Sequence, residues 1–125
     1  MKANELRINN YVHYNMFQFV IWSITKDCVD LDNEVLDKHL TNIKASALLP
    51  IALTEEWLLK FGFEIRIQVE SQTYYILNGV EIIWDELDNC FCFKRSLLKF
   101  IDIKSSHQLQ NLYFALTGKE LTIKQ

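Results

Sequence analysis

The chain has 125 residues, half of them apolar, and 13 Lys and Arg against 16 Asp and Glu, which gives a formal net charge of −3. This is the size of one ordinary domain or of two very small units, and the apolar fraction excludes a disordered or low-complexity chain. A mildly acidic balance also gives no general electrostatic attraction for nucleic acid.

The beginning of the chain, residues 1–7, lacks the apolar core of a secretion signal, and no apolar run approaches the roughly 20 residues of a bilayer span. We therefore expect a cytoplasmic protein that does not bind membranes. Three cysteines, Cys28, Cys90 and Cys92, are an odd number, which argues against a framework of disulfide bonds.

Short strands are predicted in the first part of the chain. Residues 10–14, 17–24 and 28–31 are rich in β-branched and aromatic side chains, and Asn or Asp residues, which tolerate turn conformations, separate these runs. The segment 35–42 is ambiguous and fits a loose helical turn. Closely spaced short strands predict a small curled, β-barrel-like sheet of the Src-homology-3 type in residues 1–53.

A short helix is predicted at the start of the second part, residues 54–125. Thr54 is a good N-cap, and Glu55 and Glu56 place negative charge in the first turn, where the helix dipole favours it. Gly62 supplies the residue that ends this helix.

An antiparallel β-meander is predicted after this helix. Asn78-Gly79 lies between two β-rich runs and is a strong hairpin signal, because a type I′ turn needs positive φ at both central residues. The predicted strands are 64–69, 73–77, 80–84, 90–93 and 99–103.

A last helix is predicted because capping residues mark both of its ends. Ser105 followed by Gln108 has the form of a capping box, and Gly118 supplies a left-handed residue at the other end. One apolar stripe is predicted to face the core: Leu109, Leu112, Tyr113 and Leu116. The fold class is therefore α+β, and its two parts, which no flexible linker separates, are expected to pack into one body.

Three stretches spread over the chain are distinctive: ELRINNYV at 5–12, PIALTEEWLLKFGF at 50–63 and HQLQNLYFALTGKEL at 107–121. They resemble a group of small uncharacterised proteins from Bacteroidetes genomes, often found in prophages and phages. The chain has Asn9 where that group more often has glycine, and Ala52 where it more often has a second proline. The resemblance implies a bacterial or phage-infected cytoplasm and brings no activity with it.

The sequence contains none of the familiar cofactor-binding motifs. Gly62, Gly79 and Gly118 each belong to a helix end or a turn, so none remains for a phosphate-binding loop. Cys90 and Cys92 are too close for an ordinary metal pair and would share one face of a strand, which favours a packing role. We predict no cofactor, no metal and no catalytic residue.

Two apolar features exceed what a small core needs. The strand segment 17–22 is apolar on both faces, and Phe114 lies about 100° from the centre of the helix stripe. Either these side chains are buried between the two parts of the protein or some of them form a contact patch. The candidate protein-binding residues are Phe17, Phe19, Trp22 and Phe114.

A locally basic and aromatic stretch offers an alternative. Basic side chains beside aromatic rings can hold a nucleic-acid strand by phosphate contact and base stacking, although the rings can equally be core. The residues of this patch are Lys94, Arg95, Lys99 and Lys104.

The sequence thus favours a non-catalytic accessory protein of a bacterium or its phage, which binds another protein as an adaptor or inhibitor. The alternative is a nucleic-acid-binding module that uses the stretch 94–104. A third interpretation is a small cysteine hydrolase that pairs a cysteine with His13, His39 or His107, for which no supporting motif exists. Homo-oligomer formation stays open.

Overall fold

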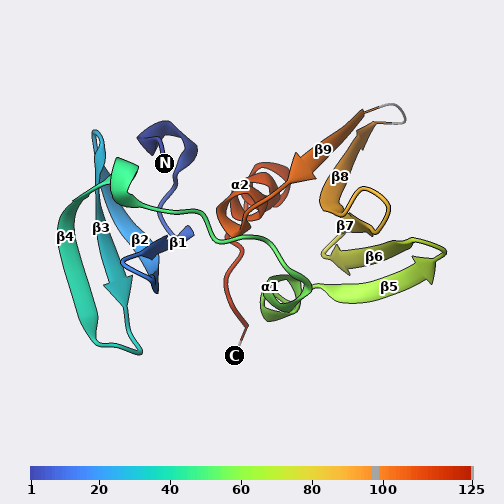
Figure 1. The fold of residues 1–125 in the computed structure, drawn as a ribbon, viewed down its shortest axis with the longest axis horizontal. Coiled ribbons are helices and arrows are strands. Elements are labelled where there is room, and N and C mark those ends of the chain that lie inside the picture. Colours follow the sequence, from blue (N-terminus) through green and yellow to red (C-terminus); the bar gives the residue numbers. More distant parts are fainter. Residues whose placement is uncertain (97–98, 125) are drawn as a thin grey trace. The chain divides into compact units, whose positions relative to one another are not determined.

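The computed structural model describes residues 1–96 and 99–124, and of Arg95, Ser96 and Lys99 it describes the backbone alone. In these residues it shows an α+β fold with antiparallel strands in two sheets and two α-helices (Figure 1). The chain divides into two compact units, Met1–Ile51 (unit 1) and Ala52–Gln125 (unit 2), against the 1–53 and 54–125 of the sequence-based division. None of the described helices has the length and apolar character needed to cross a membrane.

Unit 1 is an antiparallel meander whose strands follow one another in the sheet. They are β1 (Tyr11–Tyr14), β2 (Phe17–Thr25), β3 (Cys28–Asn33) and β4 (Lys38–Lys44). A 3-10 turn, η1 (Ala3–Glu5), precedes β1, and a second, η2 (Ala45–Ala47), follows β4. After η2, Leu49 returns to form an antiparallel bridge with His13 of β1. No strand pairing joins β4 to β1 within the described residues, so the sheet is open rather than a closed barrel.

The segment expected as a loose helical turn, 35–42, instead forms the end of the β3–β4 loop and most of strand β4. Leu40 pairs with Leu31 of β3 and packs against the core. The register shifts between this pair and the next one, and Asn42 at this point has a φ of 58°. Such a bulge breaks the alternation of apolar and polar residues by which a strand is recognised in a sequence.

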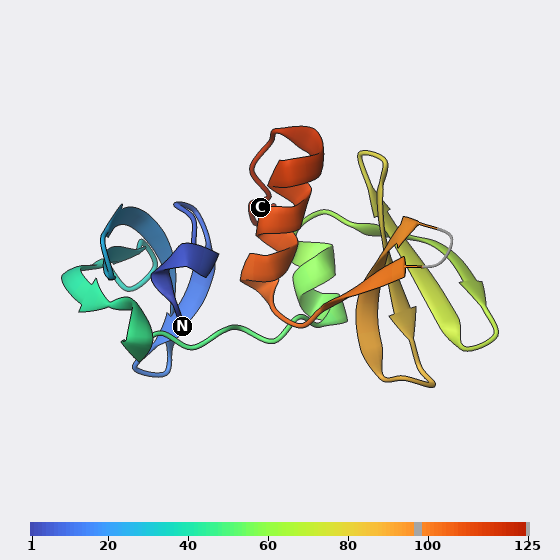
Figure 2. The same ribbon diagram turned by 90° about the horizontal axis from the view of Figure 1, so that it is seen from above.

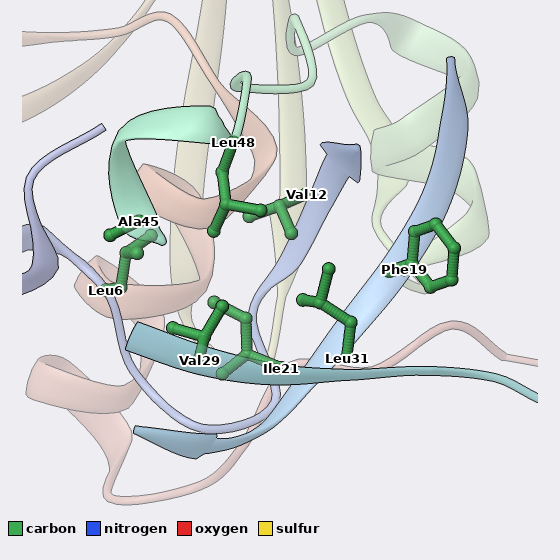
Figure 3. Packing of buried hydrophobic residues seen from close by; sticks show 8 residues of the cluster. All are labelled: Leu6, Val12, Phe19, Ile21, Val29, Leu31, Ala45 and Leu48. Carbon is green, nitrogen blue, oxygen red and sulfur yellow. The ribbon is translucent and has the colours of Figure 1, made fainter. Parts of the chain in front are cut away.

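Figure 3 shows the core of unit 1, in which apolar side chains from the strands and from the segments before β1 and after β4 point toward one another. A second register shift, between Ile21 and Ser23 of β2, leaves Trp22 as an extra residue outside the regular pairing with β3. The buried residues of this core are Leu6, Val12, Phe19, Ile21, Val29, Leu31, Ala45 and Leu48.

Unit 2 contains the predicted meander with a helix on either side of it in sequence. Its elements are α1 (Glu55–Lys60), β5 (Glu64–Val69), β6 (Gln72–Leu77), β7 (Val80–Asp85), β8 (Cys90–Ser96), β9 (Lys99–Ile103) and α2 (Ser106–Thr117). Neighbours in sequence are neighbours in this sheet, so β5 and β9 are its edges. Both helices lie on the same side of the sheet (Figures 1 and 2).

The helix signals of the sequence are confirmed. The Thr54 hydroxyl accepts a hydrogen bond from the Trp57 amide at 3.3 Å, and Ser105 and Gln108 form a capping box. Gly118 ends α2 with a φ of 73°. Two side-chain contacts then attach the helices to the sheet: the Tyr75 hydroxyl of β6 donates to the Glu55 carboxylate of α1, and the Asn78 amide donates to the Tyr113 hydroxyl of α2 at 2.8 Å.

Helix α2 buries a different face from the predicted one. Leu109 and Tyr113 are buried as expected, but Leu116 is half exposed and Gln110 is fully buried. The Gln110 side-chain amide donates to the carbonyl oxygen of Leu121 at 3.0 Å. Because this bond offsets the cost of burying an amide, a polar residue occupies a core position that an apolar stripe does not reveal.

The β6–β7 hairpin turns at Asn78-Gly79 as predicted, with φ of 48° and 83°. A Cβ at Gly79 would have nothing within 4 Å, so substitutions there test the backbone conformation alone.

We expect Gly79→Val to lower the free energy of unfolding by about 1–2 kcal/mol, because a β-branched residue is strained at positive φ. Gly79→Asn is the matched control and should lose much less, since asparagine tolerates this conformation. Urea denaturation of both variants measures the difference. Equal losses for valine and asparagine would mean that the backbone conformation at residue 79 is not what matters.

Candidate functional site

The outer face of the unit 1 sheet carries a row of side chains drawn from all four strands. Tyr11 pairs with Val20, Val20 with Asp32, and Asp32 with His39, so the four residues lie side by side across the sheet. Neighbouring residues of a strand point to opposite faces, and Leu31 belongs to the core. This outer row, Tyr11, Val20, Asp32 and His39, therefore faces away from the core.

Trp22 extends the outer row. Alternation along β2 places it on the face opposite to Ile21, the register shift leaves it without a paired residue on β3, and 47% of it is exposed. Its ring centroid lies 5.0 Å from that of His39, with the two rings tilted by 37°. His39 Nδ1 in turn lies 3.8 Å from a carboxylate oxygen of Asp32. A half-exposed indole and a carboxylate that lie on either side of one histidine form a surface that attracts a cationic side chain of a partner, by ring face and by charge.

The candidate protein-binding residues of unit 1 lie on different faces of its sheet. Phe19 is 3% exposed and belongs to the core of unit 1, so it takes no part in a surface of the folded unit. Phe17 is half exposed, but it lies two residues before Phe19 and so on the core side of the sheet, opposite to Trp22. Phe114 is partly exposed on α2 of unit 2. Of the three in unit 1, Trp22 alone joins the outer row.

The alternative nucleic-acid stretch lies on β8 and β9 of unit 2. Lys94 pairs with Phe100 across these strands, and cross-strand partners share a face of the sheet. Lys94 is exposed and Phe100 is 55% exposed, so a cation and an accessible ring stand next to each other. Lys104, just after β9, is also exposed. The side chains of Arg95 and Lys99 lie outside the described residues.

The cysteines of β8 are held in the thiol form. Burial raises the pKa of Cys92 to about 11, and the neighbouring Cys90 and Asp102 add to this effect. Burial, and then the charge of Asp102, also raises the pKa of Cys90. Such thiols are poor nucleophiles and poor metal ligands at neutral pH. In the part of the chain that the structure describes, no group of three or more His, Cys, Asp or Glu is arranged to hold a metal ion.

We expect Cys92 to react slowly with a thiol reagent in the native protein at pH 7. The thiolate is the reactive form, and a thiol whose pKa is about 11 ionises to about one part in ten thousand at this pH, against a few per cent for a free cysteine. Mass spectrometry of peptides from a labelling time course measures this rate, and urea-unfolded protein is the control. Native labelling of Cys92 at the unfolded rate would contradict the expectation.

No protein-family model matches the chain, and neither a curated protein nor a solved structure matches it. The resemblance to small proteins of Bacteroidetes and their phages therefore stays a prediction from three sequence stretches. The outer row and the Lys94–Phe100 pair are exposed surfaces with chemistry suited to binding.

Proposed function

We propose that this chain is a non-catalytic protein-binding module, an adaptor or inhibitor that acts in the cytoplasm of a bacterium or of a phage-infected cell. The observation that carries this proposal is Trp22, a large, half-exposed aromatic residue at a β-bulge, whose ring lies beside that of His39, which in turn lies 3.8 Å from Asp32. Tryptophan is among the residues most enriched at the energetic centres of protein interfaces. The partner's surface covers the indole, and a Lys or Arg of the partner approaches Asp32.

The Src-homology-3 type expected for residues 1–53 is part of the same proposal. Two features of unit 1 support it: the 3-10 turn η2 at the end of β4, and the return of Leu49 to β1. The bulges in β2 and β4 favour a curled sheet, because an extra residue bends its strand and increases the local twist. In such a sheet the outer row lies on the convex side.

We expect Trp22→Ala to weaken binding of the captured partner by about 30-fold, since a tryptophan at the centre of an interface commonly contributes about 2 kcal/mol. The partner is obtained by affinity capture from lysate of a Bacteroidetes host, with and without phage infection, and its affinity is then measured with purified components. Leu87→Ala is the matched control, because Leu87 is an almost fully exposed apolar residue of unit 2. Equal affinities of the Trp22→Ala and Leu87→Ala proteins would refute a role for the outer row.

A nucleic-acid-binding module is the second candidate, because Lys94 and the half-exposed Phe100 share one face of the sheet. Binding through phosphate contacts weakens steeply with salt, whereas binding through an aromatic anchor persists. A salt series with a single-stranded oligonucleotide, using Lys94→Ala and Phe100→Ala, separates the two. Salt-sensitive binding that both variants abolish, and that Trp22→Ala leaves intact, would replace the protein-binding proposal by this one.

A further inference from the structure

We infer that the free edge of β5 in unit 2 binds an extended peptide segment of a protein partner as an added strand. This surface belongs to the other unit and is independent of the outer row of unit 1. It would give the module a second contact, made by main-chain hydrogen bonds and selective for the charge and the apolar side chains of the added strand.

Strand β5 lies at one edge of the unit 2 sheet. It is an edge strand that pairs with β6 alone, and Figures 1 and 2 show it as the last strand on its side of the sheet. No backbone hydrogen bond joins its outer side to another segment within residues 1–96 and 99–124. The opposite edge is less open, because just after β9 the Lys104 carbonyl accepts a hydrogen bond from the Leu53 amide at 3.0 Å. An unpaired row of amides and carbonyls is a template for another strand.

The side chains of β5 are open to solvent. All six residues of the strand are exposed, including Ile65, Ile67 and Val69 at 48%, 43% and 49%. These β-branched residues favour a paired strand, and an exposed edge that carries them is a site of strand association. The surface is therefore accessible to a partner, and burial of its apolar side chains would stabilise the complex.

The unpaired charges along this edge are acidic. Arg66 is already neutralised, since its Nε lies 2.6 Å from a carboxylate oxygen of Glu81. Glu64 at the start of the strand and Glu70 just beyond its end form no ion pair in the described part of the chain. An apolar strand flanked by two carboxylates matches a segment with Lys or Arg near both of its ends.

The same charges disfavour a second copy of this chain as the occupant. An antiparallel pairing of two β5 strands centred on Ile67 places Glu64 of one copy opposite Glu70 of the other. Like charges directly opposite each other destabilise a strand pair, and this pairing contains two such contacts. Glu64 and Glu70 therefore attract a basic peptide, whereas they repel a second copy of β5.

The register of β5 adds a requirement on the apolar residues of the peptide. Ile65 pairs with Tyr75 and Ile67 pairs with Tyr74, so a bulge at Arg66 places the two isoleucines on opposite faces of the sheet. Tyr75 contacts α1, which identifies its face as the helix side. The added strand therefore meets apolar residues on both faces, and a continuous β-branched or aromatic run fits better than a strictly alternating one.

The test is a selection of random twelve-residue peptides, displayed on phage, against the immobilised full-length protein. We expect the enriched peptides to carry a β-branched or aromatic run between Lys or Arg residues. Synthetic copies of them should slow the hydrogen exchange of backbone amides in residues 64–70, because an added strand hydrogen-bonds the main chain. The double variant Glu64→Lys/Glu70→Lys should bind them about tenfold more weakly, since two attractive charge contacts become repulsive.

Two control proteins make the result specific. Asp88→Lys/Asp102→Lys changes two exposed carboxylates, one in the β7–β8 loop and one on β9 at the opposite edge of the sheet, and should bind the peptides like the parent. Trp22→Ala should also bind like the parent, so a failure of the outer row in unit 1 leaves this result intact. Enrichment of no peptide, of peptides without basic residues, or of peptides that protect no amide in β5 would each overturn the inference.

Discussion

Replacing Leu31 by alanine is expected to lower the free energy of unfolding by about 2–5 kcal/mol, the largest effect of any substitution considered for unit 1. Leu31 is fully buried at the centre of the sheet, where it pairs with Ile21 of β2 and Leu40 of β4 (Figure 3). Removal of its side chain leaves a cavity that strands on both sides must share. A unit of about 50 residues has only a few kcal/mol of stability in total, so we expect unit 1 to unfold in this variant.

Thermal denaturation followed by circular dichroism, with the dispersion of amide signals in an NMR spectrum, measures this loss. Val35→Ala is the matched control, because Val35 is an aliphatic residue of the same unit that is almost fully exposed. Its stability should stay within about 0.5 kcal/mol of the parent. If Leu31→Ala also stays that close, the core of unit 1 is assigned to the wrong residues.

A loss of stability above pH 10 is expected from Tyr75. Burial of this side chain, and then its hydrogen bond to Glu55 and the charge of that carboxylate, raise the pKa of the Tyr75 hydroxyl well above its ordinary value of 10. An unfolded chain releases this proton near pH 10 while the folded chain retains it, so above pH 10 the unfolded state binds fewer protons. Stability is therefore full below pH 10 and falls as the pH rises, by at most about 1.4 kcal/mol for each pH unit.

Urea denaturation midpoints between pH 8 and pH 12 measure this slope. Tyr75→Phe should remove part of it, whereas the control Tyr74→Phe retains Tyr75 and should retain that part. The comparison between variants is needed because the raised pKa of Cys92 contributes a loss of the same sign. Identical slopes for the two variants would show that Tyr75 does not hold its proton more tightly in the folded protein.

The parts of the fold that the sequence predicts well are those that local chemistry determines. Thr54, Ser105 and Gly118 begin or end helices through hydrogen bonds and φ values that involve only their near neighbours. Asn78-Gly79 likewise forms its turn within four residues. Signals of this kind do not depend on which strands pair. The local structures that they predict are therefore present in the folded protein.

The parts that the sequence does not predict depend on pairing between distant segments. His39 becomes a neighbour of both Trp22 and Asp32 only through the registers of β2 with β3 and of β3 with β4, and each of these registers contains a shift. Gln110 is buried because the carbonyl of Leu121 is there to receive its amide. The candidate site was accordingly predictable in one residue, Trp22, and its surroundings were not.

The bulge at Trp22 implies that the fold of unit 1 can do without this residue. On either side of it, Ile21 pairs with Leu31, Ser23 with Asp30 and Ile24 with Val29, so three consecutive residues of β3 face positions 21, 23 and 24. Deletion of residue 22 would remove the bulge and leave an uninterrupted ladder between β2 and β3, with every inward side chain in its place. Deletion of a neighbouring position would instead remove one of the paired residues. A tryptophan at a position that strand pairing does not require is the side chain on which the proposed binding role of the outer row rests.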